Sequence, residues 1–409
     1  MTAPPNIPGF ACADGGVIAA RGFLASGVSA GLKPSGRRDL ALITAEKPVP
    51  AAAVFTTNRV AAAPVVVSRR HIAGGLLRAV LINAGNANAC TGAQGLSDAE
   101  AMAAAVADEL GCASGEVVVS STGVIGVPLP IERVISAIPD AVGALDSRTG
   151  DAAAEAIMTT DTFAKQTALT FGVDGERYTV GGMAKGSGMI APNMATMLSV
   201  ITTDAPLTSA ACDAALRSAV ATTFNRVTVD MDTSTNDMCV LMASGADGGA
   251  LIDPGSPAYE LVAEAVHAVA LELARMVARD GEGATKLVAV TVSSAQSTAD
   301  AEKAAFAIAN SPLVKTALFG NDANWGRVAG ALGRSGAAID PDGFDIDFAG
   351  IRVCRGGAAV SFDEAEALAA LSQPEVSIDV RINLGDAEAT VWTCDLTYEY
   401  VRINGEYRS

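Results

Sequence analysis

The sequence predicts a mixed α/β or α+β fold, and two observations support that prediction. Segments typical of buried strands are intermixed with segments of helical periodicity along both halves of the 409-residue chain. Half of the residues are hydrophobic but only 4% are aromatic, so the core must consist of small, closely packed side chains. No low-complexity linker or fixed-period repeat divides the chain, whose length suits two or three lobes or one large unit.

The first half of the chain predicts a strand, a helix and a second strand in that order. Apolar runs over residues 79–82 and 116–119 are typical of buried strands, and a polar, glycine-containing turn follows each, over 83–88 and 120–123. Between them, Ser97-Asp-Ala-Glu100 has the pattern of a capping box, which predicts a helix to about Leu110 that ends at Gly111. Polar loops after strands are where functional sites usually form.

The second half predicts further strands and helices before a β-rich end. Strands are expected over 197–203, 226–230 and 287–293, and helices over about 208–223, 257–279 and 298–310, the second with Ser256 as its N-cap. Residues 344–348 and 351–354 flank Ala349-Gly350 as a hairpin. A last strand is indicated where apolar residues alternate with polar ones, at Val376, Ile378, Val380, Ile382 and Leu384.

Charge and cysteine usage exclude several classes of protein. The formal net charge is −17, and Lys/Arg clusters do not exceed pairs such as Arg37-Arg38, so no nucleic-acid partner is expected. Seven scattered cysteines without CxxC spacing argue against a disulfide framework or a zinc site, and no metal is expected. The beginning of the chain lacks a basic n-region and no apolar run approaches 20 residues, which predicts a soluble, cytoplasmic protein without membrane contact.

The stretch Lys185-Gly-Ser-Gly-Met-Ile-Ala-Pro-Asn-Met-Ala-Thr-Met-Leu198 places Thr196 behind the small residue Ala195 near the middle of the chain. A threonine at a chain terminus carries its own base, an α-amine with a pKa of about 7.7–8.0. Attack of the Thr196 hydroxyl on the preceding carbonyl, an N-to-O acyl shift and ester hydrolysis would create that terminus. A mid-chain Ala-Thr pair is by itself ordinary, so the hypothesis needs support from elsewhere.

Other motifs are weaker. Gly186-Ser-Gly188-Met-Ile-Ala191 matches a dinucleotide fingerprint, but Pro192 and the strand expected from 197 leave too little room for its helix. The segment 230–237 is rich in aspartate, but it lacks the glycine and glutamate of a calcium loop, which favours a turn or a helix entry. The chain has only two histidines, His71 and His267, which argues against a Ser-His-Asp triad.

Lys185 to Leu198 resembles the cleavage-site motif of the ornithine acetyltransferase family of arginine biosynthesis, whose members are glutamate N-acetyltransferases and often bifunctional. Further blocks resemble the family in the expected order, so that the resemblance covers essentially the whole chain. They are Ser121-Thr-Gly-Val-Ile-Gly126, Ile157-Met-Thr-Thr-Asp-Thr162, Asp280-Gly-Glu-Gly-Ala-Thr-Lys286, Asn324-Trp-Gly-Arg327 and the end from Tyr400 to Ser409. One departure is Met231, which stands where the family usually has the glycine of Asp-Gly-Asp.

The resemblance implies an αββα-like layered sandwich of the ornithine acetyltransferase and self-processing aminopeptidase type. It implies cleavage between Ala195 and Thr196 into chains 1–195 and 196–409, which stay intertwined and pair as α2β2. The implied reaction is ping-pong transfer of acetyl from N2-acetylornithine to glutamate, with release of ornithine, no metal or organic cofactor, and acetyl-CoA as a possible second donor. The alternative is an N-terminal-nucleophile aminopeptidase or amidohydrolase, in which water resolves the acyl-enzyme.

The same resemblance assigns roles to particular residues. Thr196 would be the nucleophile, and Thr122 with Gly123 would form the oxyanion hole, which agrees with a hydroxyl and a backbone N–H at a turn after a strand. Lys185 suits a carboxylate or a developing negative charge, and Glu282 suits an ammonium group. The implied substrate contacts are Thr159, Lys185, Thr196, Glu282, Asn404 and Ser409. For the last two to bind, the C-terminal tail must fold back over the site.

Overall fold

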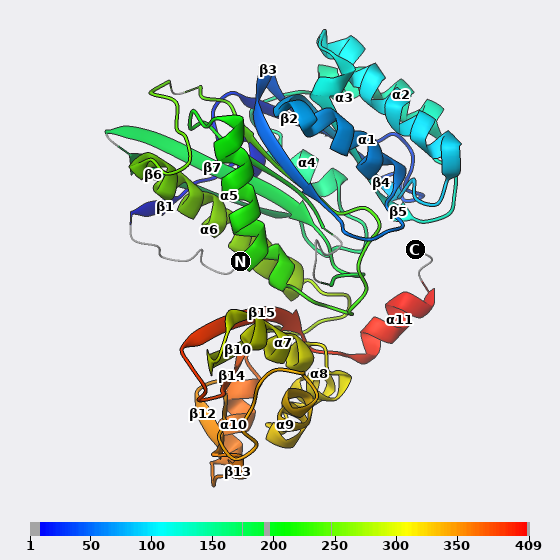
Figure 1. Ribbon diagram of the computed structural model, residues 1–409. Coiled ribbons are helices and arrows are strands. Elements are labelled where there is room, and N and C mark those ends of the chain that lie inside the picture. Colours follow the sequence, from blue (N-terminus) through cyan, green and yellow to red (C-terminus); the bar gives the residue numbers. More distant parts are fainter. Residues whose placement is uncertain (1–8, 174, 192–196, 247, 407–409) are drawn as a thin grey trace.

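The computed structural model describes residues 9–173, 175–191, 197–246 and 248–406, and it shows a mixed α/β protein built on two sheets (Figure 1). In the described part of the chain the larger sheet has nine strands in the order β1-β6-β7-β8-β9-β3-β4-β5, with β2 beside β3. These strands are β1 (Phe10–Cys12), β2 (Phe23–Val28), β3 (Leu40–Phe55), β4 (Leu76–Asn86), β5 (Val117–Val124), β6 (Lys165–Val173), β7 (Glu176–Lys185), β8 (Leu198–Thr203) and β9 (Met238–Ala243).

The larger sheet forms two layers because β3 is long enough to belong to both. Its first part, from Leu40 to Thr44, pairs with β2 and β4, and its last part, from Ala51 to Phe55, pairs with β9 after a shift of register. Successive side chains of a strand point to opposite faces of the sheet. Ile43 therefore enters the core between the two layers, whereas Leu42 packs in the core beneath the outer helices. The inner core joins β2, β3, β4 and β5 to β7, β8 and β9.

Helices cover both outer faces and complete the αββα order, which confirms the predicted fold class (Figure 1). On one side α1 (Ala63–His71), α2 (Gly92–Leu110) and α3 (Ile131–Gly143) pack on β4 and β5. On the other side α5 (Ser209–Thr222) and α6 (Pro257–Arg279) pack on β6 to β9. A shorter helix, α4 (Gly150–Ala156), contributes to the inner core.

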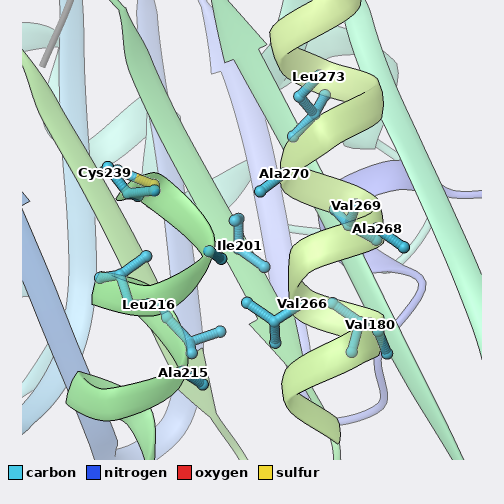
Figure 2. Close-up of a cluster of buried hydrophobic side chains, with 14 of the residues drawn as sticks. Val180, Ile201, Ala215, Leu216, Cys239, Val266, Ala268, Val269, Ala270 and Leu273 are labelled. Carbon is cyan, nitrogen blue, oxygen red and sulfur yellow. The ribbon is translucent and has the colours of Figure 1, made fainter. Parts of the chain in front are cut away.

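Helix α6 shows how the small side chains permit this packing. It starts as expected, because Ser256 accepts a hydrogen bond from the Tyr259 amide and Pro257 needs no intrahelical partner. Figure 2 shows Val266, Val269 and Leu273 of this helix directed at the sheet. A Cβ added to Gly182 of β7 would lie 3.0 Å from the Leu273 side chain, so glycine there lets the helix approach closely. Each buried valine or leucine contributes about 1.5–3 kcal/mol.

The smaller sheet forms a second lobe with its own core, which no linker in the sequence marks (Figure 1). Its strands are β10 (Leu287–Ala295), β11 (Asp345–Phe348), β12 (Ile351–Arg355), β13 (Ala358–Ala359), β14 (Glu375–Arg381) and β15 (Ala387–Cys394). Its helices are α7 (Thr298–Ala309), α8 (Pro312–Phe319), α9 (Trp325–Gly333) and α10 (Glu364–Leu371). From β15 the chain continues into α11 (Tyr398–Glu406), which lies apart from the second sheet in Figure 1.

Two predicted elements differ from the structure. The helix expected from Ser97 is present as α2 and ends at Leu110 before Gly111 as predicted, but it begins earlier, at Gly92. Asn88 accepts the Thr91 hydroxyl and donates to the Gly95 carbonyl, which closes the first turn. Residues 226–230 are not a strand. Val227 makes one isolated bridge to Trp392, and its apolar alternation with Val229 reflects burial alone.

The other expected elements of the second half are confirmed to within two residues as β8, α5, α6, β10, α7 and the β11–β12 hairpin. In the last strand Val376, Ile378 and Val380 are buried as predicted, whereas Leu384 lies beyond β14 and is exposed. Within the described ranges, none of the helices combines the length and apolarity that a membrane crossing requires.

Candidate active site

One cavity of about 250 Å³ gathers most of the residues that the sequence singled out. It lies where β5 and β7 end, beneath α11 and beside the loop that follows α6. The predicted site residues that line it are Thr122, Gly123, Thr159, Lys185, Glu282 and Asn404. Ala195, Thr196 and Ser409 lie outside the described residues. Residues far apart in the sequence therefore meet in a single pocket.

Thr122 and Gly123 belong to a strand and not, as predicted, to a turn, because β5 continues to Val124 in parallel register with β4. Gly123 has φ +130°, and a Cβ there would lie 2.4 Å from the Gly85 carbonyl carbon, so only glycine fits. Asn236 fixes this strand end, since its side-chain amide donates to the Ser121 and Ala87 carbonyls. The Thr122 hydroxyl and the Gly123 backbone line a rigid edge of the pocket.

Lys185 places a buried ammonium group beside that edge. It ends β7, is 3% exposed, and donates to the Thr159 hydroxyl at 2.8 Å and to the Thr122 hydroxyl at 3.5 Å. Burial lowers the pKa of Lys185, and the carboxylates around it, Asp161 first among them, oppose that shift. A buried cation of this kind stabilises negative charge on a bound group or a reaction intermediate.

Asp161 organises the floor under Lys185. One of its carboxylate oxygens accepts the Gly186 amide at 2.7 Å, and the other accepts the Thr159 amide at 2.9 Å and lies 3.9 Å from the Lys185 ammonium. Burial opposes the ionisation of Asp161, but Lys165 and Lys185 together outweigh it and hold the pKa of this carboxyl well below its usual range. Three pocket segments are thus tied to one carboxylate.

The network continues through Lys165, a fully buried lysine on β6. Its ammonium donates to Asp161 at 2.7 Å and to Asp280 at 2.5 Å. Asp280 also accepts the amide and the hydroxyl of Thr162. Because Asp280 precedes the loop that carries Glu282, the buried pairs fix that loop relative to Lys185.

Glu282 and Asn404 join the loop after α6 to the tail. The Asn404 side-chain amide donates to a Glu282 carboxylate oxygen at 2.8 Å, and the Glu282 amide donates to the Ser187 carbonyl at 2.9 Å. A Cβ on Gly188 would lie within 2.5 Å of the Glu282 carboxylate, so this glycine makes room for it. The tail therefore folds back over the site at least as far as Asn404.

Sequence reasoning missed an acidic wall of the pocket formed by Asp230, Asp232 and Tyr400. Asp230 accepts the amides of Met189 and Ile190 at 2.7 and 2.8 Å, and its side chain is hydrogen-bonded to Tyr400. Burial raises the pKa of Asp230 to about 6. The run of aspartates was visible in the sequence, but only the fold shows that Asp230 and Asp232 line the same pocket as Lys185 and Glu282.

Met231, which lies in the chain between Asp230 and Asp232, has a backbone conformation that suits glycine. Its φ is +72°, in the left-handed region that residues other than glycine and asparagine rarely adopt, and the residue is 53% exposed. The departure from the family pattern therefore places a methionine in a strained backbone. No group of three or more potential metal ligands occurs among the residues that the structure describes.

Asp237 holds the start of β8, directly after Thr196 in the chain. This carboxyl is fully buried and accepts the Met197 amide at 3.1 Å. Burial raises the pKa of Asp237 well above its usual value. Since β7 and β8 pair in antiparallel register with Lys185 opposite Leu198, the two ends of the connection that contains Thr196 lie side by side.

Neither a dinucleotide site nor a Ser-His-Asp triad is supported at the pocket. The described residues 186–191 form no helix, as a dinucleotide site would require. His71 Nδ1 lies 2.7 Å from the Val117 carbonyl and His267 Nε2 lies 3.1 Å from the Thr222 hydroxyl, and neither histidine lines the cavity.

Fold and pocket together define a class: an αββα protein whose pocket is lined by hydroxyl groups, a buried ammonium group and carboxylates. The chain belongs to the ArgJ family, whose model matches residues 24–409. The arginine biosynthesis bifunctional protein ArgJ of Symbiobacterium thermophilum is 52% identical over 97% of this chain and 99% of its own length. That of Geobacter sulfurreducens is 49% identical over 95% and 99%.

Among solved structures, ornithine acetyltransferase complexed with ornithine from Mycobacterium tuberculosis is 46% identical. Its TM-score is 0.43, and the match covers 45% of this chain and 98% of that chain.

Proposed function

We propose that this protein transfers the acetyl group of N2-acetyl-L-ornithine to L-glutamate in arginine biosynthesis. The observation that carries the proposal is the meeting of Thr122, Gly123, Thr159, Lys185, Glu282 and Asn404 in one pocket, which holds the Lys185 ammonium together with the carboxylates of Asp230, Asp232 and Glu282. Membership of the ArgJ family supports the same activity. The carboxylates suit the cationic side chain of ornithine, and Lys185 suits a carboxylate or an oxyanion.

In the proposed cycle the Thr196 hydroxyl attacks the acetyl carbonyl of the donor while the Thr196 α-amine takes the hydroxyl proton. The resulting oxyanion is stabilised by the Thr122 hydroxyl and the Gly123 amide, with Lys185 nearby. The C–N bond breaks, the α-ammonium returns the proton to the leaving amine, and ornithine departs. The amine of glutamate then attacks the acetyl ester by the same steps in reverse order, which regenerates the Thr196 hydroxyl.

The cycle requires prior self-cleavage between Ala195 and Thr196 into chains 1–195 and 196–409. Since β7 precedes that bond and β8 follows it, and the two are hydrogen-bonded neighbours, the chains would stay joined through one sheet. We propose that two such pairs assemble as α2β2. The cycle needs no metal or organic cofactor, acetyl-CoA is a second donor, and the enzyme works in the cytoplasm.

Product analysis tests transfer against the alternative of an amidohydrolase. Purified protein is incubated with N2-acetylornithine with and without glutamate, and acetate, ornithine and N-acetylglutamate are quantified. The proposal expects ornithine and N-acetylglutamate in equal amounts and little acetate when glutamate is present. Equal acetate release with and without glutamate would refute the transferase and favour the hydrolase.

A further inference from the structure

A second, larger cavity of about 1050 Å³ adjoins the active-site pocket. Thr159 lines both cavities, and Asp161, which holds Lys185 in the first, lines the second. The outer wall is the loop 31–38, which contributes Lys33, Arg37 and Arg38. The cavity is large enough to hold a cofactor-sized molecule.

The loop 31–38 is a built structure and not a loose surface segment. Asp39 is fully buried, and its carboxylate accepts the backbone amides of Ala30, Leu32 and Lys33 at 2.5 to 2.9 Å. The Lys33 ammonium in turn donates to the carbonyls of Arg38 and Ala156 at 2.7 and 3.0 Å. The basic side chains are therefore presented from a fixed backbone.

The acidic residues of this cavity are already engaged by cations. Glu155 pairs with Arg38 at 2.6 Å, Glu406 pairs with Arg402, and Asp161 pairs with Lys165.

Among the residues that the structure describes, neither Lys33 nor Arg37 has a carboxylate in direct contact. The Lys33 ammonium donates to two backbone carbonyls, and the Arg37 side chain has no hydrogen bond or ion pair to this part of the chain. Burial lowers the pKa of the half-buried Lys33 to about 8, and the nearby carboxylates of Asp39 and Asp161 only partly oppose that shift. In a chain of net charge −17, two basic side chains without a direct ion pair beside the active site are a specific feature.

We propose that this basic cavity binds the phosphate groups of an acyl-CoA donor, so that its acetyl thioester enters the neighbouring pocket past Thr159. A donor with several phosphate charges matches the two basic side chains, and a long flexible arm suits a ligand that spans two cavities sharing Thr159. The inference rests on the proposed use of acetyl-CoA. N2-acetylornithine carries no phosphate, and it would not use this cavity.

Steady-state kinetics with each donor and direct binding test the proposal. In Arg37→Ala we expect the KM for acetyl-CoA to rise about tenfold and that for N2-acetylornithine to change less than twofold, with a larger acetyl-CoA effect in Arg37→Glu. Arg355→Ala, which removes an equally exposed arginine on β12 of the second lobe, should change neither constant. The KM for acetyl-CoA should also rise with salt.

Unchanged acetyl-CoA constants in both Arg37 variants, equal changes for both donors, or a change confined to glutamate would each overturn the proposal. Titration calorimetry with adenosine 3′,5′-bisphosphate measures phosphate binding in the cavity directly. It therefore distinguishes failure of this inference from failure of the proposed function. A wild-type enzyme that binds this probe, with binding lost in Arg37→Glu, supports the cavity even if acetyl-CoA is not turned over. No binding of the probe to wild type overturns the inference while leaving transfer from N2-acetylornithine intact.

Discussion

Replacing Asp161 by asparagine should destabilise the protein strongly, although the side chain keeps its shape. The carboxylate is fully buried and accepts from Lys165, from the Gly186 amide and from the Thr159 amide, and it faces Lys185 at 3.9 Å. An asparagine can accept through only one of its two terminal atoms. Whichever way it turns, its NH2 group meets at least one of these donors, and a negative charge beside two buried lysines is lost.

The magnitude follows from the burial of the pair. Removal of one partner of a buried ion pair costs about 3–5 kcal/mol, because it leaves the other charge uncompensated. Lys165 retains Asp280 at 2.5 Å, which sets the expected loss at the lower end, about 3 kcal/mol. The double variant Asp161→Asn/Lys165→Met removes both charges, so its loss should be smaller than the sum of the single losses.

Urea unfolding followed by circular dichroism measures these changes. The matched control is Asp213→Asn, the same substitution in the exposed Asp213–Arg217 pair of α5, which should cost less than about 0.5 kcal/mol. A loss below about 1 kcal/mol for Asp161→Asn, or a loss equal to that of the control, would refute the assignment of this carboxylate as the organiser of the pocket floor.

Three further predictions concern Met231, Asp230 and Glu282. Met231→Gly should raise stability by about 0.5–1 kcal/mol in thermal unfolding, since it removes a left-handed methionine, whereas Met231→Ala should give no gain. Because burial raises the pKa of Asp230 to about 6, the carboxylate gains a proton below that pH, and kcat/KM for the cationic donor should fall there. An Asp230→Asn variant whose kcat/KM falls in the same way at low pH would contradict this assignment. Glu282→Gln should raise the KM for N2-acetylornithine at least tenfold in initial-rate assays, and an unchanged KM would exclude an ionic role.

Much of the fold was accessible from the sequence because the signals were local. Helix α6 carries its own cap at Ser256 and a regular apolar face, and it was predicted to the residue. The strand β9 was not predicted, because a short apolar run is compatible with a buried strand or a buried helix segment, and only its pairing with β8 and β3 decides between them. The αββα order came from the family resemblance, since the sharing of β3 between two layers leaves no local pattern.

The site was predicted only in part for a similar reason. Thr122 and Lys185 were marked by motifs, but the clustering that joins Lys185 to Asp161 and Lys165 depends on three separate strands and loops. Asp230 looked like a turn residue, and its place in the pocket follows from amides at Met189 and Ile190 that the sequence alone does not bring near it. Buried charge networks of this kind become visible only when the layers are assembled.

Intact mass spectrometry of the purified protein under denaturing conditions, beside a Thr196→Ala variant, tests the central claim most directly. The account predicts two fragments from the wild type, one ending at Ala195 and one beginning at Thr196, and a single 409-residue chain from the variant. A single full-length chain from a wild-type preparation that transfers acetyl groups, with equal activity in the variant, would contradict it.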